Sequence, residues 1–344
     1  MDNFELFTAS YKLVRDVLKV SSNEEVVITT DTGSDFQVTL SIAQASTALG
    51  AKPLIVLRNE APTVGKAMDK YLPVNTLSAA LMNADVWIAL DKSYLIYSTP
   101  YEKAMSVGRV RYIELSGFNV DMMVRLIGRV NTQLLYEFQR KLARLTGRFR
   151  RMRIITELGT DVEFENDPNR PILVEGEVNG PGEYMLFGQV DWAPIEESIN
   201  GTIVIDGTVW PPIGILHSPI KLRVRDGKII EVSGGSEAKV LEKWLRSFND
   251  EKMFMVAHVT YGCHPPNAKL SGNIVEDERV WGRRCVGASV VNQRRLGGKL
   301  GLASSHVDAV VLNNTIYGDG ELIVKDGEFV HEEVRELARE LKGA

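Results

Sequence analysis

The segment Ala303-Ser304-Ser305-His306-Val307-Asp308-Ala309-Val310-Val311-Leu312 joins two polar side chains to an apolar run. The β-branched residues of 307–312 predict a buried strand that begins beside His306. Residues i and i+2 of a strand point to the same face of a sheet, so His306 and Asp308 are expected to lie side by side. Imidazole and carboxylate groups are both common metal ligands. The segment therefore predicts a core strand that carries part of a metal site, with a third ligand from elsewhere in the chain.

The C-terminal half of the chain, residues 149–344, has the pattern of a strand-rich α+β domain. Short β-branched runs alternate with turn residues, and one amphipathic helix is expected over residues 236–248. The pairs Asp206-Gly207, Asp226-Gly227 and Asp326-Gly327 each predict a hairpin turn. We expect this half to be the metal-site domain.

The N-terminal half, residues 1–148, alternates between helical and strand patterns. Helices are expected over residues 4–20, 36–49 and 64–71, and strands over residues 25–30, 52–57, 85–90 and 111–115. This alternation predicts an α/β domain built on a parallel sheet. The loop 30–35 has neither the GxGxxG nor the GxxxxGK[ST] spacing of a nucleotide loop, so a plain turn with a Ser34 or Asp35 helix cap is expected.

Composition and local sequence argue against nucleic acid and membranes as partners, and they favour one cellular compartment. The formal net charge of −5 leaves no basic surplus for binding nucleic acid. No apolar run is long enough to span a membrane, and the acidic N-terminus lacks the layout of a signal peptide. The two cysteines, Cys263 and Cys285, stand in separate segments, which favours a cytoplasmic protein without a disulfide framework.

Only five histidines are available to complete the metal site. His331, before a charged helix, is expected to be exposed, and His217, in a proline-rich loop, is expected to be structural or exposed. That leaves His258, His264 and His306. His258 interrupts an apolar strand pattern, and a buried imidazole must have a partner. It is either a core histidine bonded to a backbone carbonyl or the third ligand. Two histidines and one carboxylate match the facial triad of non-haem Fe(II) oxygenases.

Several motifs of the C-terminal half carry a family resemblance. They are Pro194-Ile195-Glu196-Glu197, Gly201-Thr202-Ile203-Val204-Ile205-Asp206-Gly207, His264-Pro265, Asn267-Ala268-Lys269-Leu270-Ser271-Gly272-Asn273, Glu276-Asp277-Glu278 and Ser305-His306-Val307-Asp308. The chain resembles the thermophilic-type metallo-aminopeptidases (the aminopeptidase S and T family). It is more similar to their relatives, the 2,5-dihydroxypyridine 5,6-dioxygenases.

The metal ligands decide between these two branches. The aminopeptidase pattern implies a pair of metal ions, and of its ligands Glu197, His306 and Asp308 are present. His258 stands where that pattern has a glutamate, and Cys285 stands where it has a histidine, so the two-metal arrangement is altered. The dioxygenase pattern implies a single Fe(II) held by His258, His306 and Asp308, with Cys285 read as a small buried residue rather than a thiolate ligand.

The resemblance implies a mononuclear non-haem Fe(II) dioxygenase that cleaves the ring of 2,5-dihydroxypyridine or a similar hydroxylated heteroaromatic. Both atoms of O₂ are inserted, and the carbon–carbon bond beside the ring nitrogen is cleaved. Glu197 is expected to act in acid–base chemistry or beside the metal ligands, and Ser305 and Tyr184 to contact the substrate. A homo-oligomer is expected.

Two alternatives belong to other classes. One is a metal-dependent aminopeptidase or amide hydrolase in which Glu197, His258, His306 and Asp308 hold one or two Zn²⁺, Co²⁺ or Mn²⁺ ions and activate water. The other is a non-enzymatic small-molecule binding protein with a decayed site.

Overall fold

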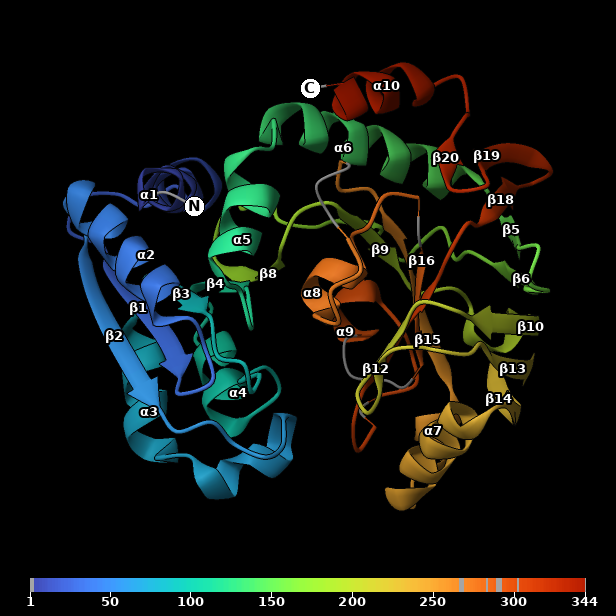
Figure 1. Ribbon diagram of the computed structural model, residues 1–344, viewed down its shortest axis with the longest axis horizontal. Helices are drawn as coiled ribbons and strands as arrows, with labels where there is room; N and C mark the ends of the chain where they lie inside the picture. Colours follow the sequence, from blue (N-terminus) through green and yellow to red (C-terminus); the bar gives the residue numbers. More distant parts are fainter. Residues whose placement is uncertain (1–2, 266–268, 283, 289–292, 302, 344) are drawn as a thin grey trace. The chain divides into compact units, whose positions relative to one another are not determined.

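The computed structural model describes residues 3–265, 269–282, 284–288, 293–301 and 303–343 (Figure 1). The chain divides into two compact units, Met1–Val130 with Glu175–Leu186, and Asn131–Val174 with Phe187–Ala344. The predicted domains, 1–148 and 149–344, differ from these units at residues 131–148 and 175–186. That residues 1–148 and 149–344 fold as two independent domains stays a prediction.

The first unit contains a parallel sheet with the strand order β2-β1-β3-β4-β8. Its strands are β1 (Glu25–Asp31), β2 (Lys52–Arg58), β3 (Val86–Ala89), β4 (Arg111–Glu114) and β8 (Gly182–Met185). β3 is buried at every position, as expected for a strand covered on both faces. The predicted α/β class is confirmed, although β8 joins the sheet from a distant part of the chain.

Helices connect the strands of this unit. They are α1 (Asn3–Lys12), η1 (Leu13–Val17), α2 (Phe36–Ala48), η2 (Gly65–Tyr71), α3 (Val74–Asn83), α4 (Thr99–Ser106), α5 (Val120–Met122) and η3 (Met123–Gly128). The predicted cap at Asp35 is confirmed, because its carboxylate accepts a hydrogen bond from the backbone N–H of Gln37 at the start of α2. The expected helix over residues 64–71 is a 3₁₀ turn, and α3 and α4 were not predicted.

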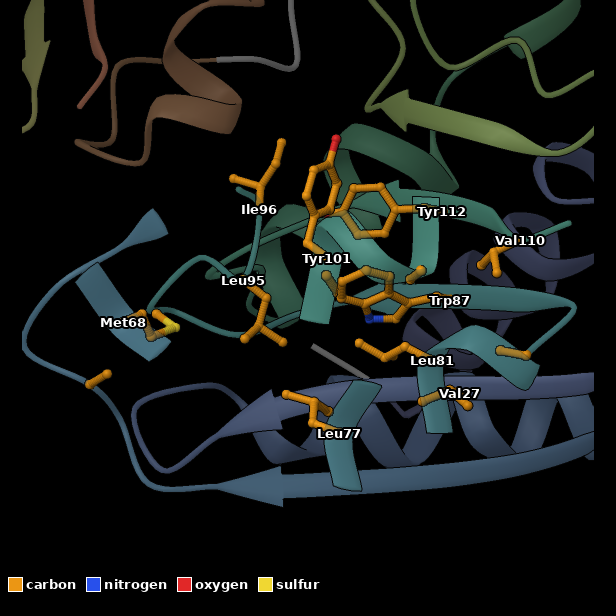
Figure 2. Packing of buried hydrophobic residues seen from close by; sticks show 14 residues of the cluster. Val27, Met68, Leu77, Leu81, Trp87, Leu95, Ile96, Tyr101, Val110 and Tyr112 are labelled. Atoms are coloured by element: carbon orange, nitrogen blue, oxygen red, sulfur yellow. The ribbon is translucent and has the colours of Figure 1, made fainter. Parts of the chain in front are cut away.

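Three aromatic rings form the centre of the apolar core of this unit (Figure 2). Trp87 lies between α3 and the rings of Tyr101 and Tyr112, with ring centroids 4.3 Å apart for Trp87 and Tyr112. The indole N–H donates to Thr29 Oγ1 at 3.0 Å, so the one polar group of this buried side chain is satisfied. The core fixes β3 and β4, and with them the acidic groups at their carboxyl ends.

Glu114, the last residue of β4, is a buried carboxyl in this unit. Tyr112 and Ser116 donate hydrogen bonds from their hydroxyls to it, and the Ser116 N–H donates at 2.9 Å. Burial raises the pKa of Glu114 to about 7, and the negative charge of Asp91 acts in the same direction, against the lowering effect of these hydrogen bonds. Because the pKa of Glu114 is above the ordinary 4.5 in the folded protein, its protonated carboxyl stabilises the folded state fully below pH 4.5. This contribution is lost as the pH rises through 7.

Replacing Glu114 by glutamine is therefore expected to make the protein less sensitive to alkaline pH. Relative to the wild type, the variant should gain about 3 kcal/mol in the free energy of unfolding between about pH 4 and pH 8, because a rise of the Glu114 pKa from 4.5 to about 7 corresponds to roughly that energy. Urea denaturation of both proteins across this range measures the difference. A difference that stays constant with pH would show that Glu114 does not titrate as the burial argument requires.

The second unit contains two further sheets. One has the order β14 (Lys228–Gly234), β13 (Ile220–Arg225), β10 (Asn200–Ile205), β6 (Asp161–Glu165), β5 (Arg151–Ile155), β18 (Thr315–Gly318), β19 (Glu321–Lys325), β20 (Glu328–Phe329). The other has the order β12 (Gly214–Ile215), β11 (Thr208–Trp210), β17 (Val307–Val311), β16 (Arg284–Ala288), β15 (Val256–Gly262), β9 (Gln189–Trp192), β7 (Leu173–Val174). The predicted strand-rich α+β class is confirmed.

Helical segments accompany these sheets. They are α6 (Thr132–Arg148), η4 (Glu196–Ser198), α7 (Ser236–Ser247), η5 (Glu251–Phe254), α8 (Ile274–Asp277), α9 (Gln293–Leu296) and α10 (Arg335–Gly343). Within the described ranges, no helix has the length and apolar character needed to span a membrane.

Two of the three predicted Asp-Gly hairpins are present. Asp226-Gly227 turns β13 into β14, and Asp326-Gly327 turns β19 into β20, with positive φ at both residues of each pair, as a type I′ turn requires. The prediction for Asp206-Gly207 is wrong, because β10 and β11 belong to different sheets. There the Gly207 N–H donates to the carbonyl of Val310, and the Asp206 carboxylate accepts from the Leu312 N–H at 2.8 Å. These bonds to the end of β17 support a crossing between sheets instead of a turn.

Candidate metal centre

Three adjacent antiparallel strands place His258 and Asp308 on one face of a sheet. His258 on β15 lies opposite Gly287 on β16, and Gly287 lies opposite Asp308 on β17. Residues that face each other across antiparallel strands point to the same side, so all three belong to one row. The register of β15 shifts between Val256 and His258, and such a bulge beside a site can turn a side chain toward its target.

The ligand-type atoms of His258, His306 and Asp308 converge. The Asp308 Oδ1 atom lies 2.9 Å from His306 Nε2 and 3.6 Å from His258 Nε2, and the two imidazole rings are nearly parallel, at 17°. One ligand atom from each residue lies within 4.8 Å of the others. A metal ion about 2.1 Å from each ligand atom separates neighbouring ligand atoms by roughly 3 Å, so the spacing and the donor types fit a divalent transition metal.

The cluster is largely buried, and its carboxyl group is ionised. His258 and Asp308 are buried, and His306 is half-buried. Burial acts to raise the pKa of Asp308, but the charges of His306 and His258 and the hydrogen bond from His306 outweigh it, so this pKa lies below its ordinary value. Asp308 is therefore a carboxylate anion at neutral pH.

The loop before β17 is anchored next to His306. Both the N–H and the hydroxyl of Ser304 donate to the Asp250 carboxylate, at 2.8 and 2.9 Å. The other Asp250 oxygen accepts from the Lys252 N–H at the start of η5. Asp250 thus ties the segment that carries His306 to a neighbouring element, which limits the freedom of that imidazole.

The remaining predicted site residues do not belong to this cluster. Glu197 is exposed on η4, whereas its neighbour Glu196 is buried and pairs with Arg170 at 2.7 Å. Ser305 is half-buried, directly before His306. Tyr184 belongs to the first unit, where its hydroxyl donates to the carbonyl of Gly180 at 3.0 Å.

The structure also places the other histidines and cysteines. His264 is fully buried and stacks on Phe187, and His217 is exposed. The expectation for His331 is wrong, because it is buried against Phe149 and lies 3.2 Å from the Glu321 carboxylate. The side chain of Cys285, and Asn267 and Ala268 of the quoted motifs, lie outside the described residues.

Sequence reasoning missed two members of the row that contains His258 and Asp308. Gly287 separates His258 from Asp308, and Trp210 on β11 lies opposite Asp308 on its other side. Trp210 therefore belongs to the same face of the sheet as Asp308. Its indole offers an aromatic surface on which a planar ring can stack. Nothing in the local sequence signals either position, because both follow from the pairing of strands distant in the chain.

Comparisons with known proteins agree with this architecture. The family model for 2,5-dihydroxypyridine 5,6-dioxygenases matches residues 5–331. The chain is 22% identical to the 2,5-dihydroxypyridine 5,6-dioxygenase of Pseudomonas putida KT2440, over 94% of this chain and 95% of that protein. A solved structure of the 2,5-dihydroxypyridine dioxygenase from P. putida KT2440 gives a TM-score of 0.79 at 21% identity and covers 97% of this chain and 100% of its own.

A second solved structure, AmpT from Thermus thermophilus, gives a TM-score of 0.70 at 15% identity, covering 95% of this chain and 99% of its own. The resemblance to the 2,5-dihydroxypyridine 5,6-dioxygenases drawn from the motifs is thereby confirmed, and the likeness to AmpT shows a shared fold.

Proposed function

Because the chain belongs to the family of 2,5-dihydroxypyridine 5,6-dioxygenases, we propose that it uses O₂ to cleave the ring of 2,5-dihydroxypyridine or a similar hydroxylated heteroaromatic at a single Fe(II) ion. The convergence of His258, His306 and Asp308 carries this proposal. Two imidazoles and one carboxylate on one side of an ion are the ligand set of non-haem Fe(II) oxygenases, and they leave coordination positions open.

Each ligand has a separate role in holding the ion. His258 and His306 would each offer an imidazole nitrogen atom, and Asp308 would offer an anionic oxygen. The buried surroundings limit the access of bulk water to this side of the ion. A bound Fe(II) supplies the one-electron chemistry that the reaction of O₂ with an aromatic ring requires.

The hydrolase alternative has less support. A pair of metal ions needs more carboxylate ligands than a single ion, and Glu197 is exposed rather than gathered with Asp308. Among the side chains that the structure describes, the three residues are the group able to hold a metal ion. The likeness to AmpT concerns the fold alone.

Several further roles belong to the proposal. Glu197 is proposed to act in acid–base chemistry, Ser305 and Tyr184 to contact the substrate, and Trp210 to stack on its ring. We also propose that the chain works as a homo-oligomer, as most soluble enzymes do. We place it in the reducing cytoplasm, since its two cysteines stand in separate segments and Cys263 is a buried free thiol. Light scattering after size-exclusion chromatography tests the oligomer.

An oxygen electrode tests the proposed reaction. Protein loaded anaerobically with Fe(II) is expected to consume about one O₂ per molecule of 2,5-dihydroxypyridine, with loss of the aromatic absorbance, because both oxygen atoms enter the cleaved ring. In this assay, Glu197→Gln should lower kcat, and Ser305→Ala, Tyr184→Phe and Trp210→Leu should raise KM. Cleavage of an aminoacyl amide without O₂ uptake would replace this proposal with the hydrolase.

A further inference from the structure

Gly287 occupies the position between two metal ligands. It faces His258 on one side and Asp308 on the other, so the two ligands come from strands separated only by β16. Neighbouring strands are about 4.8 Å apart, which puts the backbones of His258 and Asp308 roughly 10 Å from each other. Their side chains nevertheless approach to 3.6 Å. They must therefore reach toward each other across the space above β16.

We propose that Gly287 is the residue that makes room for the metal ion, and that its lack of a side chain sets the size of the site. The inference rests on the proposed function, because it assumes that the three ligands hold a metal. Gly287 acts as a positioning residue, since it offers no ligand atom of its own.

The alternation of strands supports this role. Residue 287 has the register position opposite both His258 and Asp308, so it belongs to the face that carries them, whereas positions 286 and 288 belong to the other face. A residue with a β-carbon at this register position would add atoms to the row between His258 and Asp308. A branched side chain would fill the volume that the ion and its open coordination positions need.

Glycine is otherwise a poor choice at this position. In a strand interior it adds backbone entropy to the unfolded chain and offers no side chain to pack, and it often marks a close approach by a ligand or by another backbone. Residues with a β-carbon fit a pleated strand better. The glycine at residue 287 is therefore explained by the metal ion that binds above this position, and not by the stability of the strand.

Anaerobic metal titration of the full chain tests the proposal. Fe(II), followed by equilibrium dialysis, and Co(II), followed by its visible absorption, are the probes for wild type, Gly287→Ala and Gly287→Val. We expect affinity to fall by about tenfold in the alanine variant and by more than about a hundredfold in the valine variant. Gly180→Ala is the matched control, because a β-carbon there meets nothing within 4 Å, and it should bind as the wild type does.

Melting curves recorded with and without metal separate this role from a structural one. Without metal, both Gly287 variants should melt no lower than the wild type, and only the rise in Tm caused by metal should be lost. Wild-type affinity in Gly287→Val, or apo variants that melt well below the wild type, would overturn the inference. If the wild-type protein itself binds no metal, both the proposed function and the role of Gly287 are wrong. If all the variants bind metal as the wild type does, only the role of Gly287 is wrong.

Discussion

Replacing Asp308 by alanine is expected to abolish metal binding and, with it, O₂ uptake. Asp308 is the one anionic member of the cluster, and its Oδ1 atom lies within 3.6 Å of both imidazole nitrogens. Loss of a residue that only supports a ligand typically weakens metal affinity by 10- to 100-fold, so loss of the charged ligand should cost more than about a hundredfold. Metal analysis after anaerobic dialysis, combined with the oxygen electrode, measures both effects.

Asp161→Ala is the control for this change. Asp161 is an exposed carboxylate at the start of β6 in the other sheet of this unit, paired with Arg153, and its loss should leave metal content and turnover unchanged. An Asp308→Ala protein that retains about one metal ion per chain would show that the metal binds elsewhere. An Asp308→Ala variant that keeps the metal and loses turnover would show that Asp308 acts in the reaction and is not needed as a metal ligand.

Replacing Arg58 by methionine is expected to destabilise the first unit by about 3–5 kcal/mol. The Arg58 guanidinium lies 2.9 Å from Asp91 Oδ1 and 3.5 Å from Asp31 Oδ2, and all three side chains are buried. Without the guanidinium, two carboxylates remain buried without their cation. Burial raises the pKa of Asp91 to about 6 even beside Arg58, so protonation should relieve part of the loss at lower pH.

Lys92→Met provides the comparison in the same region. Lys92 forms an ion pair with Glu60 in which both side chains are about half exposed, and such a pair contributes less than about 1 kcal/mol. Urea denaturation of the two variants at neutral pH should therefore differ by at least about 2 kcal/mol. Equal stabilities would mean that the buried cluster contributes no more than a surface pair.

Local patterns in the sequence predicted the features that depend on neighbouring residues. The expected strand over residues 25–30 is β1, and the expected helix over residues 36–49 is α2, because the apolar spacing and the Asp35 cap act within a few residues. The contact between His306 and Asp308 was predictable for the same reason. Their separation by two residues at the start of a strand leaves little choice of geometry.

Features set by distant pairings were not predictable in this way. The position of Gly287 between His258 and Asp308 depends on the register of three strands, and a slip of one residue would turn it to the other face. Asp206-Gly207 has the sequence of a hairpin turn, yet its hydrogen bonds to the end of β17 direct the chain into another sheet. His331 has polar neighbours in sequence, but the fold packs it against Phe149.

We propose that His258, His306 and Asp308 hold one metal ion that serves as the reaction centre. Metal analysis of protein loaded with Fe(II) and dialysed under argon tests it most directly, with His258→Ala measured beside the wild type. We expect about one iron per wild-type chain and almost none in the variant. Two metal ions per wild-type chain, or equal iron in both proteins, would contradict a single centre built from these three residues.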